Sequence, residues 1–486
     1  MSVENRIVKV QKRNRALVRF DAGRICGAIL RAGRSIGGFN QDLLPGTNDR
    51  LFQAWPQEEQ LAGFLAEMVI VVLNSDPHHL SANFPPTIER IQDAVLHALR
   101  SYGFQQTADA YCCYRWGRHW LREGAIQQSQ FVGNGLATER TQQALAWNHG
   151  QGCDTVAGLN ELVRASKLKP VIEASLVQYH DSVGQAAEKI LQRISSGEPL
   201  RMIWVTGPSS SGKTTTTVKL MQLLERQGMR FLMLNLDDYF WSLVEHPTDW
   251  INDRNFEAPE AMDIQLLNEH LRLLLEGKSV EKPVFDFKQG RRAGSRTIRL
   301  EANEVLLLDC LHGLYPPLVE GIDSRAQFRL YLEAQTGVLE KDGSTGQMTL
   351  SADIRLLRRM LRDARHRNHT PLRTILHWHY VRAGELFSIL PLSGLADHVI
   401  NTGSAFELAV LKPFFTGEQS QLPGLEEFGG YRGFMDAEIR YDRIRRLLES
   451  VEGVSREQSQ STELLPGDAV LREFIGGSTV KVPHND

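Results

Sequence analysis

Long apolar runs are scarce in this sequence. The longest, Met68–Leu73, is far too short to span a bilayer, and the first six residues lack the apolar core of a signal peptide. We therefore expect a cytoplasmic protein that makes no contact with a membrane.

Cysteine is also rare, with five residues in a chain of 486. Their odd number and irregular spacing match neither a disulfide framework nor a zinc site. Cys112 and Cys113 are neighbours that could form a strained redox pair, but we expect them to stay reduced on a helix, as cytosolic cysteines do.

An excess of positive charge is missing as well. The chain carries 55 lysines and arginines against 58 acidic residues, a net charge of −3, so no overall basic field favours nucleic acid as a partner. A hydrophobic fraction of 42% and a charged fraction of 23% are those of an ordinary globular protein. The length suggests about two to four domains.

The most informative stretch is Gly207-Pro-Ser-Ser-Ser-Gly-Lys-Thr214, which matches the phosphate-binding pattern G-x-x-x-x-G-K-[ST]. It lies between an apolar run at residues 202–206, which predicts a buried strand, and a run with helical periodicity at residues 215–227. A chance match in a turn is the alternative, but strand, loop and helix together are what phosphate binding requires.

This loop predicts an ATP site. Gly207 and Gly212 permit a tight turn that brings backbone N–H groups against phosphate oxygens, and the next helix points its positive dipole end at them. Lys213 can reach the β and γ phosphates, and the hydroxyl of Thr214 can ligate Mg²⁺. The residues expected to bind ATP are Gly207, Ser209, Ser210, Ser211, Gly212, Lys213, Thr214 and Thr215.

Further strands are expected at residues 231–236, 305–309, 328–332 and 398–400, with helices between them, notably at 261–275. This alternation predicts an α/β fold with a parallel sheet covered on both faces, which binds ligands at the carboxyl ends of its strands. Asp237 and Asp309 stand at two strand ends and should share the rim with the loop. Asp309 can then hold Mg²⁺ with Thr214, and Asp237 can accept a proton from an attacking hydroxyl. The alternative for each carboxylate is a helix cap.

Arginines recur at helical spacing after Asp353. Arg355, Arg358 or Arg359, and Arg362 can share one face, which suits a lid that closes over a transferred phosphoryl group. A solvated basic helix is the alternative. Four histidines between residues 366 and 379 lack a cysteine or carboxylate that would complete a metal-ligand spacing, so we expect surface or packing roles for them.

The first 180 residues predict mainly helices. Residues 3–20 suggest a hairpin with a basic turn, Asp21 can cap the next helix, and further helices are expected at 58–73, after Pro86 and at 106–123. A linker follows, with a helical stretch around 159–163 that Pro170 should end or interrupt. Residues 171–179 predict a short element of their own, and 182–194 an amphipathic helix.

The N-terminal unit resembles the ATP-cone, a regulatory nucleotide-binding module, over about residues 3–120. The likeness rests on the order of short motifs: Lys12-Arg13, Phe20-Asp21, Ile91-Gln-Asp93 and Ala108-x-Ala-Tyr-x-x-Tyr-Arg115. The resemblance implies an adenine nucleotide effector that binds Val10, Lys12, Arg13 and Arg24. A helical oligomerisation module without a ligand is the alternative.

Residues 183–480 resemble the uridine kinase and phosphoribulokinase family. The shared motifs include the loop, Leu236-Asp-Asp-Tyr-Phe240, Asn255-Phe-Glu-Ala-Pro259, Pro283-Val-Phe-Asp286, Asp353-x-Arg355 and Leu471-Arg-Glu-Phe474. The resemblance implies ATP-dependent phosphorylation of a small-molecule hydroxyl, typically the 5′-hydroxyl of a nucleoside. The catalytic residues that it implies are Lys213, Asp237, Arg355 and Arg358, and the substrate contacts are Asp237, Tyr239, Glu257, Phe285 and Arg355.

The base preference stays open at this point. Phe285 stands where uridine kinases carry a base-contacting Tyr, and Gly290 lies near the place of a base-contacting His. An apolar site discriminates bases weakly, whereas a buried hydrogen-bonding site discriminates strongly.

The sequence thus predicts four parts: an ATP-cone-like nucleotide-sensing domain (1–124), a helical connector (125–182), a P-loop kinase core (183–416) and a C-terminal helical extension (417–486). We expect ATP and Mg²⁺ as cofactors, a small-molecule substrate, control by adenine nucleotide and a homo-oligomer. Two alternatives stay open: an ATP-binding regulator with a non-catalytic core, and a kinase of a non-nucleoside sugar hydroxyl.

Overall fold

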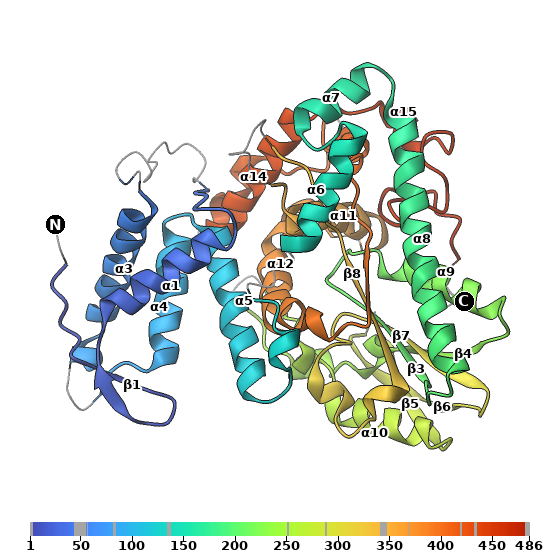
Figure 1. The fold of residues 1–486 in the computed structure, drawn as a ribbon, viewed down its shortest axis with the longest axis horizontal. Helices are drawn as coiled ribbons and strands as arrows, with labels where there is room; N and C mark the ends of the chain where they lie inside the picture. The colour runs from blue at the N-terminus through green and yellow to red at the C-terminus, as the bar shows by residue number, and fades with distance from the viewer. Residues whose placement is uncertain are drawn as a thin grey trace.

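The computed structural model describes residues 3–42, 55, 57–80, 84–133, 138–249, 252–286, 289–340, 348–367, 369–417, 420–431 and 435–481. A small N-terminal helical unit, blue in Figure 1, packs beside a larger unit built around a sheet. None of the described helices is both long enough and apolar enough to cross a membrane.

A five-stranded sheet forms the centre of the larger unit. Its strands are β3 (Met202–Thr206), β4 (Arg230–Asn235), β7 (Glu304–Cys310), β8 (Gln327–Glu333) and β9 (His398–Asn401). They lie in the order β4-β7-β3-β8-β9, and every pairing is parallel. The predicted parallel α/β sheet is confirmed, and its central strand β3 is buried along its whole length, as strands covered on both faces are.

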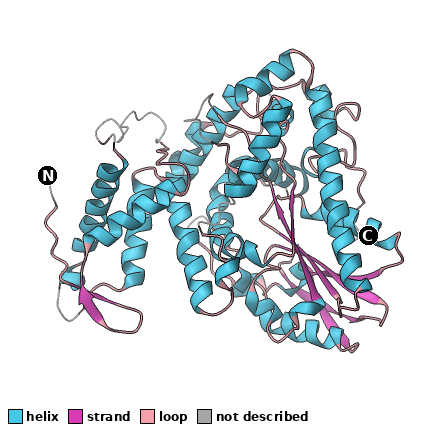
Figure 2. Cartoon of the chain, in the orientation of Figure 1, coloured by secondary structure: helices cyan, strands magenta, loops and turns pink. Residues whose placement is uncertain are grey.

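Alternate side chains of β3 enter two cores, because successive residues of a strand point to opposite faces. Ile203 and Val205 pack in one core, and Met202 and Trp204 pack in the other. Figure 2 shows helices on both sides of the sheet. The second core includes α10 (Ile264–Leu275).

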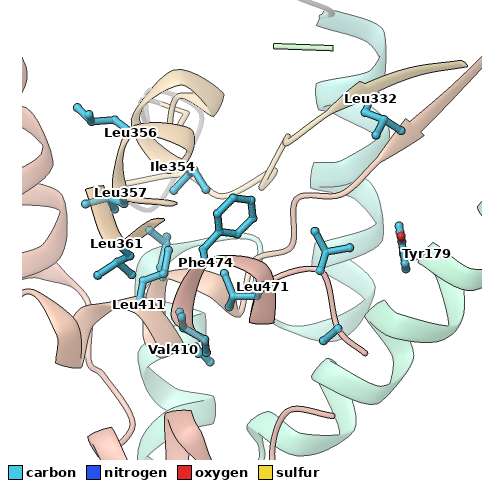
Figure 3. Packing of buried hydrophobic residues seen from close by; sticks show 14 of the residues in the cluster. Tyr179, Leu332, Ile354, Leu356, Leu357, Leu361, Val410, Leu411, Leu471 and Phe474 are labelled. Atoms are coloured by element: carbon cyan, nitrogen blue, oxygen red, sulfur yellow. The ribbon is translucent and has the colours of Figure 1, made fainter. Parts of the chain in front are cut away.

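The first core is the larger one and gathers helices from distant parts of the chain. Figure 3 shows Phe474 beside Ile354 and Leu471 in this cluster, with Leu332 of β8 farther away. Its helices are α7 (Val156–Arg164), α8 (Leu168–Ser195), α9 (Lys213–Glu225), α11 (Ser351–His366), α12 (Pro371–Gly384), α13 (Glu407–Leu411), α14 (Met435–Ser450) and α16 (Arg472–Ile475). Segments after residue 417 are therefore built into the main core, and α15 (Arg456–Gln460) lies between α14 and α16 along the chain.

The N-terminal unit follows the predicted order of elements. It contains β1 (Lys9–Gln11), β2 (Leu17–Arg19), α1 (Ala22–Arg34), α3 (Glu58–Asn74), α4 (Ile88–Ser101) and α5 (Gln105–Arg122). The hairpin is confirmed by antiparallel pairing of β1 with β2. Asp21 caps α1, because its Oδ1 accepts a hydrogen bond from the Gly23 N–H at 3.0 Å. Cys112 and Cys113 are buried on α5 as free thiols.

The connector differs from its prediction. Helix α8 runs without a break through the short element and the amphipathic helix that we expected as two pieces, so residues 182 and 183 lie inside one helix. Pro170 stands in the first turn of α8, where its missing N–H costs nothing, and it does not end a helix. Helix α6 (Thr138–Gln151) was not predicted.

A second hairpin was also missed. Strands β5 (Ser279–Asp286) and β6 (Arg291–Arg299) pair antiparallel. Most of β6 is exposed, and its polar residues give no apolar alternation that would predict a strand.

Candidate active site

The glycines of the phosphate-binding loop are required by its geometry. Gly207 has φ +152°, and a Cβ there would lie 2.4 Å from the carbonyl oxygen of Leu332. Gly212 has φ +81°, and a Cβ would lie 2.4 Å from Cγ1 of Val470. A side chain at either position would be strained and would collide with its neighbour, so the predicted tight turn is confirmed.

The two residues predicted to hold Mg²⁺ are in contact at the end of the loop, where α9 begins. The Thr214 hydroxyl, at the start of α9, donates to Oδ2 of Asp309 on β7 at 3.3 Å. Burial raises the pKa of Asp309 to about 6, although the Lys213 ammonium opposes that shift. Hydroxyl and carboxylate oxygens are the donors that Mg²⁺ prefers, and a cation would relieve the cost of a buried carboxylate, so these residues fit the ion.

Lys213 reaches back over the loop. Its Nζ donates to the carbonyl oxygens of Gly207 at 3.1 Å and Pro208 at 3.2 Å. Burial lowers the pKa of Lys213, and the Asp309 carboxylate acts in the opposite direction. The ammonium therefore stands beside Thr214 and Asp309, where it could meet a phosphate.

Asp237 lies on the same rim, directly after β4. The sheet register sets Asn235 of β4 opposite Asp309 of β7. Asp237 is exposed at the surface, but the many protein atoms around its carboxylate desolvate it and raise its pKa, against the effect of the Arg367 guanidinium. The capping role belongs to Asn235, whose side chain accepts from the Asp237 N–H at 3.1 Å. The helix-cap alternative for Asp237 is therefore wrong.

The arginines of α11 converge on the loop, but α11 is not a lid. Arg355 and Arg358 are both 0% exposed. Arg355 pairs with Glu385 and donates to the Ser209 carbonyl at 3.0 Å. Arg358 pairs with Glu407 and donates to the Ser210 carbonyl at 3.1 Å. Both guanidiniums are buried and hold the backbone of the loop through its carbonyls. The prediction of a lid and its alternative, a solvated basic helix, are therefore both wrong.

Arg359 and Arg362, further along α11, reach a side chain of the loop instead. Arg359 Nη1 donates to Ser209 Oγ at 2.6 Å, and Arg362 Nη2 lies 3.5 Å from the same atom. Burial and the neighbouring Arg359 and Arg367 lower the pKa of Arg362 to about 10. Arg359 also pairs with Asp363 at 2.7 Å, whereas the shortest ion pair of Arg362 is 4.0 Å, to Glu473, so Arg362 is the less compensated of the two and the better placed for an anion. Helical spacing alone did not rank these two above Arg355 and Arg358.

Glu257 lies beside these arginines as a buried carboxylate. Its Oε1 is 3.3 Å from Arg359 Nη1 and 3.8 Å from His377 Nε2. Burial alone would raise the pKa of Glu257, but Arg359 and His377 outweigh it and hold the pKa well below its usual range. His377 is also paired with Asp253 at 2.5 Å, so this histidine belongs to an ion-pair network that the sequence did not indicate.

Aromatic rings cluster next to Asp237, where the N–H of Phe240 donates to the Asp237 carbonyl oxygen at 3.3 Å. The ring centres of Phe240 and Phe285 are 6.0 Å apart, those of Phe240 and Phe256 are 5.7 Å apart, and His246 is 5.0 Å from Phe256. Nε2 of His246 is buried and has no hydrogen-bond partner among the described residues. His246 is thus a polar group beside the ring cluster, and its single position in a loop gave no signal in the sequence.

Tyr239 does not join this ring cluster. It is 0% exposed, and its hydroxyl hydrogen-bonds Nδ1 of His270 on α10 at 3.0 Å. Because the side chain is buried in the second core, the expected substrate contact of Tyr239 is wrong. Asp238, its neighbour, accepts from the N–H of Phe285 at 3.0 Å and thereby fixes hairpin β5–β6 against the site.

Glu473 is a residue of the site that the sequence did not single out for function. Its Oε2 accepts from the N–H of Thr215 at 3.3 Å and from the Thr215 hydroxyl at 2.8 Å. The N–H groups in the first turn of α9 are those that such loops present to phosphate. A carboxylate from α16 therefore competes for one of the expected ATP contacts.

The effector residues expected in the N-terminal unit come from the hairpin and from the start of α1. Val10 is buried, while Arg13 extends to α4, where it pairs with Glu89 at 2.6 Å. Arg24 pairs with Asp21 at 3.3 Å. The role of the expected residues as effector contacts stays a prediction.

Comparison with known proteins agrees with this geometry. The family model of the phosphoribulokinase and uridine kinase family matches residues 202–340, and that of the ATP cone domain matches residues 8–119. A uridine kinase of Deinococcus deserti is 30% identical over 210 residues, which are 43% of this chain and 91% of that protein. A uridine kinase of Bacillus pumilus is 28% identical over 210 residues, 43% of this chain and 90% of that protein.

Among solved structures, a putative fructose transport system kinase from a Silicibacter species is similar with a TM-score of 0.31 and 15% identity, over 43% of this chain and 93% of that one. That similarity is too low to bear on function. The match to the Deinococcus enzyme, which covers nearly all of that enzyme, and the loop with its two strand-end carboxylates lead to one conclusion: the chain belongs to the phosphoribulokinase and uridine kinase family, and it carries an ATP-cone domain before the kinase core.

Proposed function

We propose that this protein transfers the γ-phosphoryl group of ATP to a hydroxyl of a small molecule, with the 5′-hydroxyl of a nucleoside as its substrate. The observation that carries the proposal is the meeting of Lys213, Asp309 and Asp237 on one rim of the sheet. These residues come from the loop and from two different strands, and phosphoryl transfer needs a phosphate cradle, a metal site and a proton acceptor together.

The side chains support one sequence of events. The substrate hydroxyl loses its proton to the Asp237 carboxylate as its oxygen attacks the γ-phosphorus, and the bond to the β-phosphate oxygen breaks to release ADP. Lys213, Arg359 and Arg362 stabilise the charge on the transferred group, because they stand at the loop with favourable fields for an anion. Thr214 and Asp309 would hold Mg²⁺, which neutralises phosphate charge when bound.

Arg355 and Arg358 have a positioning role in this proposal. They hold the carbonyls of Ser209 and Ser210, so they fix the direction in which the loop points its N–H groups. Neither guanidinium has an exposed edge that a substrate reaches directly.

The ring cluster beside Asp237 supports a nucleoside over a simple sugar. Glu257 is held as a carboxylate and can accept hydrogen bonds from ribose hydroxyls, while Phe240, Phe256 and Phe285 offer flat apolar surface for a base. His246 is the polar atom available for the edge of that base. We expect modest discrimination among bases, because one hydrogen-bonding group replaces the two polar readers of related enzymes.

The experiment is ATP consumption with a panel of nucleosides and sugars, comparing wild type with Asp237→Asn. Asp181→Asn, an exposed aspartate on α8, is the matched control. We expect turnover with at least one nucleoside, a loss of about a hundredfold or more in kcat for Asp237→Asn, and no change in the control. Turnover with sugars alone would favour the non-nucleoside kinase, and no turnover with any acceptor would favour the ATP-binding regulator.

Control by adenine nucleotide through the ATP cone is part of the proposal. Titration of ATP and dATP at saturating substrate, with rate and solution mass recorded together, tests it. A change in rate or in assembly supports control at the cone, and constancy of both contradicts it.

A further inference from the structure

A cavity of about 760 Å³ lies where the ATP cone meets the kinase core. Its walls come from α4 and α5 of the cone and from β8, α11, α12 and α14 of the core. Pro208 of the phosphate-binding loop forms part of its wall, but Lys213, Asp237 and Glu257 do not line it, so it adjoins the candidate active site from the side of the cone. Its volume falls within the range of small-molecule sites, and clefts between domains are common places for them.

The charges on its walls are balanced and mostly committed to one another. Four arginines and four carboxylates line the cavity. Arg382 bonds Asp109 at 2.6 Å and Glu385 at 2.5 Å, and Arg440 bonds Asp436 at 2.7 Å. A triphosphate needs a cluster of uncommitted cations, which such a wall does not supply. The lining therefore favours an uncharged ligand.

Buried polar atoms on the walls identify what that ligand must offer. The hydroxyl of Tyr331, Oε2 of Glu333 and Nε2 of Gln106 have no hydrogen-bond partner among the described residues. The three residues are 0%, 2% and 8% exposed. Buried polar groups are almost always paired, and these three supply a donor, an acceptor and a hydroxyl that can be either.

We propose that this cavity binds an uncharged molecule of nucleoside size with both donors and acceptors, and that the ligand class is a nucleoside. A base edge presents both donors and acceptors, which are the groups that Gln106, Tyr331 and Glu333 lack as partners. The base faces and ribose ring match the apolar part of the wall, which includes Met348, Leu390 and Ile439.

Contacts along one wall connect this cavity to the phosphate-binding loop. Asp109 of the cone pairs with Arg382, Arg382 with Glu385, and Glu385 with Arg355. Arg355 then donates to the Ser209 carbonyl at 3.0 Å. A bound nucleoside would lie against this series, so it should change the KM for ATP; that consequence rests on the proposed kinase function.

Equilibrium dialysis of the full chain with labelled uridine, cytidine, adenosine and guanosine tests the site. The main variant is Gln106→Leu, and Tyr331→Phe is the second. Thr107→Val is the matched control, because Thr107 is the neighbouring residue on α5, is 0% exposed and also carries an unpartnered hydroxyl, but does not line the cavity. Glu257→Gln marks the active site separately.

We expect Gln106→Leu and Tyr331→Phe each to weaken nucleoside binding at the cavity about tenfold, while Thr107→Val leaves it unchanged. Glu257→Gln should leave binding at the cavity intact. The proposal is overturned if both cavity variants bind every nucleoside as wild type does, or if only Glu257→Gln weakens binding. Nucleoside binding that depends on Gln106 without any phosphorylation would overturn the proposed function and leave this site standing.

Discussion

The carboxylate of Glu473 accepts a hydrogen bond from the backbone N–H of Thr215, in the first turn of α9, at 3.3 Å. We predict that Glu473→Gln tightens ATP binding by about three- to tenfold, because it removes a negative charge beside the phosphate site. Titration calorimetry with a non-hydrolysed ATP analogue measures it, with the exposed Glu463→Gln as control. Weaker binding in Glu473→Gln would show that the carboxylate supports the loop.

The ionisation of His377 should make the stability of the protein depend on pH. Burial opposes its charge, but hydrogen bonds and charges from Asp253 and Glu257 raise its pKa to about 9. Because the folded pKa lies above the ordinary value of about 6.5, this contribution to stability is complete below pH 6.5 and is lost as pH rises through 9. We expect the free energy of unfolding to fall by on the order of 2–3 kcal/mol across that window.

Urea unfolding at pH 6, 7.5 and 9 measures this slope, and His377→Gln should flatten it. An equal slope in wild type and variant would mean that other groups control the dependence.

At the scale of elements, the burial of α11 indicates that its first arginines are structural rather than catalytic. Arg358 is 0% exposed between Glu407 and the loop. We predict that Arg358→Met lowers the free energy of unfolding by about 3–5 kcal/mol, because Glu407 is left buried and unpaired. Adding Glu407→Leu should recover much of that loss. If Arg358→Met keeps full stability and loses only kcat, Arg358 acts on the transferred group after all.

The same scale shows how far local patterns determine an element. Continuous apolar runs located strands such as β3 and β7 of the central sheet, because these strands are buried on both faces. Pro170 misled the prediction of α8, since proline interrupts a helix interior but is accepted in a first turn. The exposed strand β6 gave no apolar pattern at all.

At the scale of the whole molecule, cone and core share their apolar clusters. Leu386 and Leu390 of the core pack in the cluster of the cone, and Trp120 of the cone packs in the second core of the sheet. The indole N–H of Trp120 also donates to the Phe387 carbonyl at 2.9 Å. We therefore predict one calorimetric unfolding transition for the full chain. Trp120→Ala should shift it as a unit, by about 3–5 kcal/mol in free energy of unfolding.

Two separated transitions in wild type would contradict this prediction. In that case the cone would be an independently folding module, and the shared clusters would contribute little to cooperativity.

The sequence by itself determined the phosphate-binding loop, the strand-end carboxylates and their common rim. Glycine spacing and apolar runs are local signals, and the rule that parallel strands share their carboxyl ends brings Asp237 and Asp309 to the loop without any contact map. Only the tertiary structure decided that Tyr239 enters the core, that Arg355 and Arg358 lie beneath the loop, and that Glu473 meets Thr215. Those outcomes depend on packing between residues far apart in the chain, and no local periodicity records which side chain fills which space.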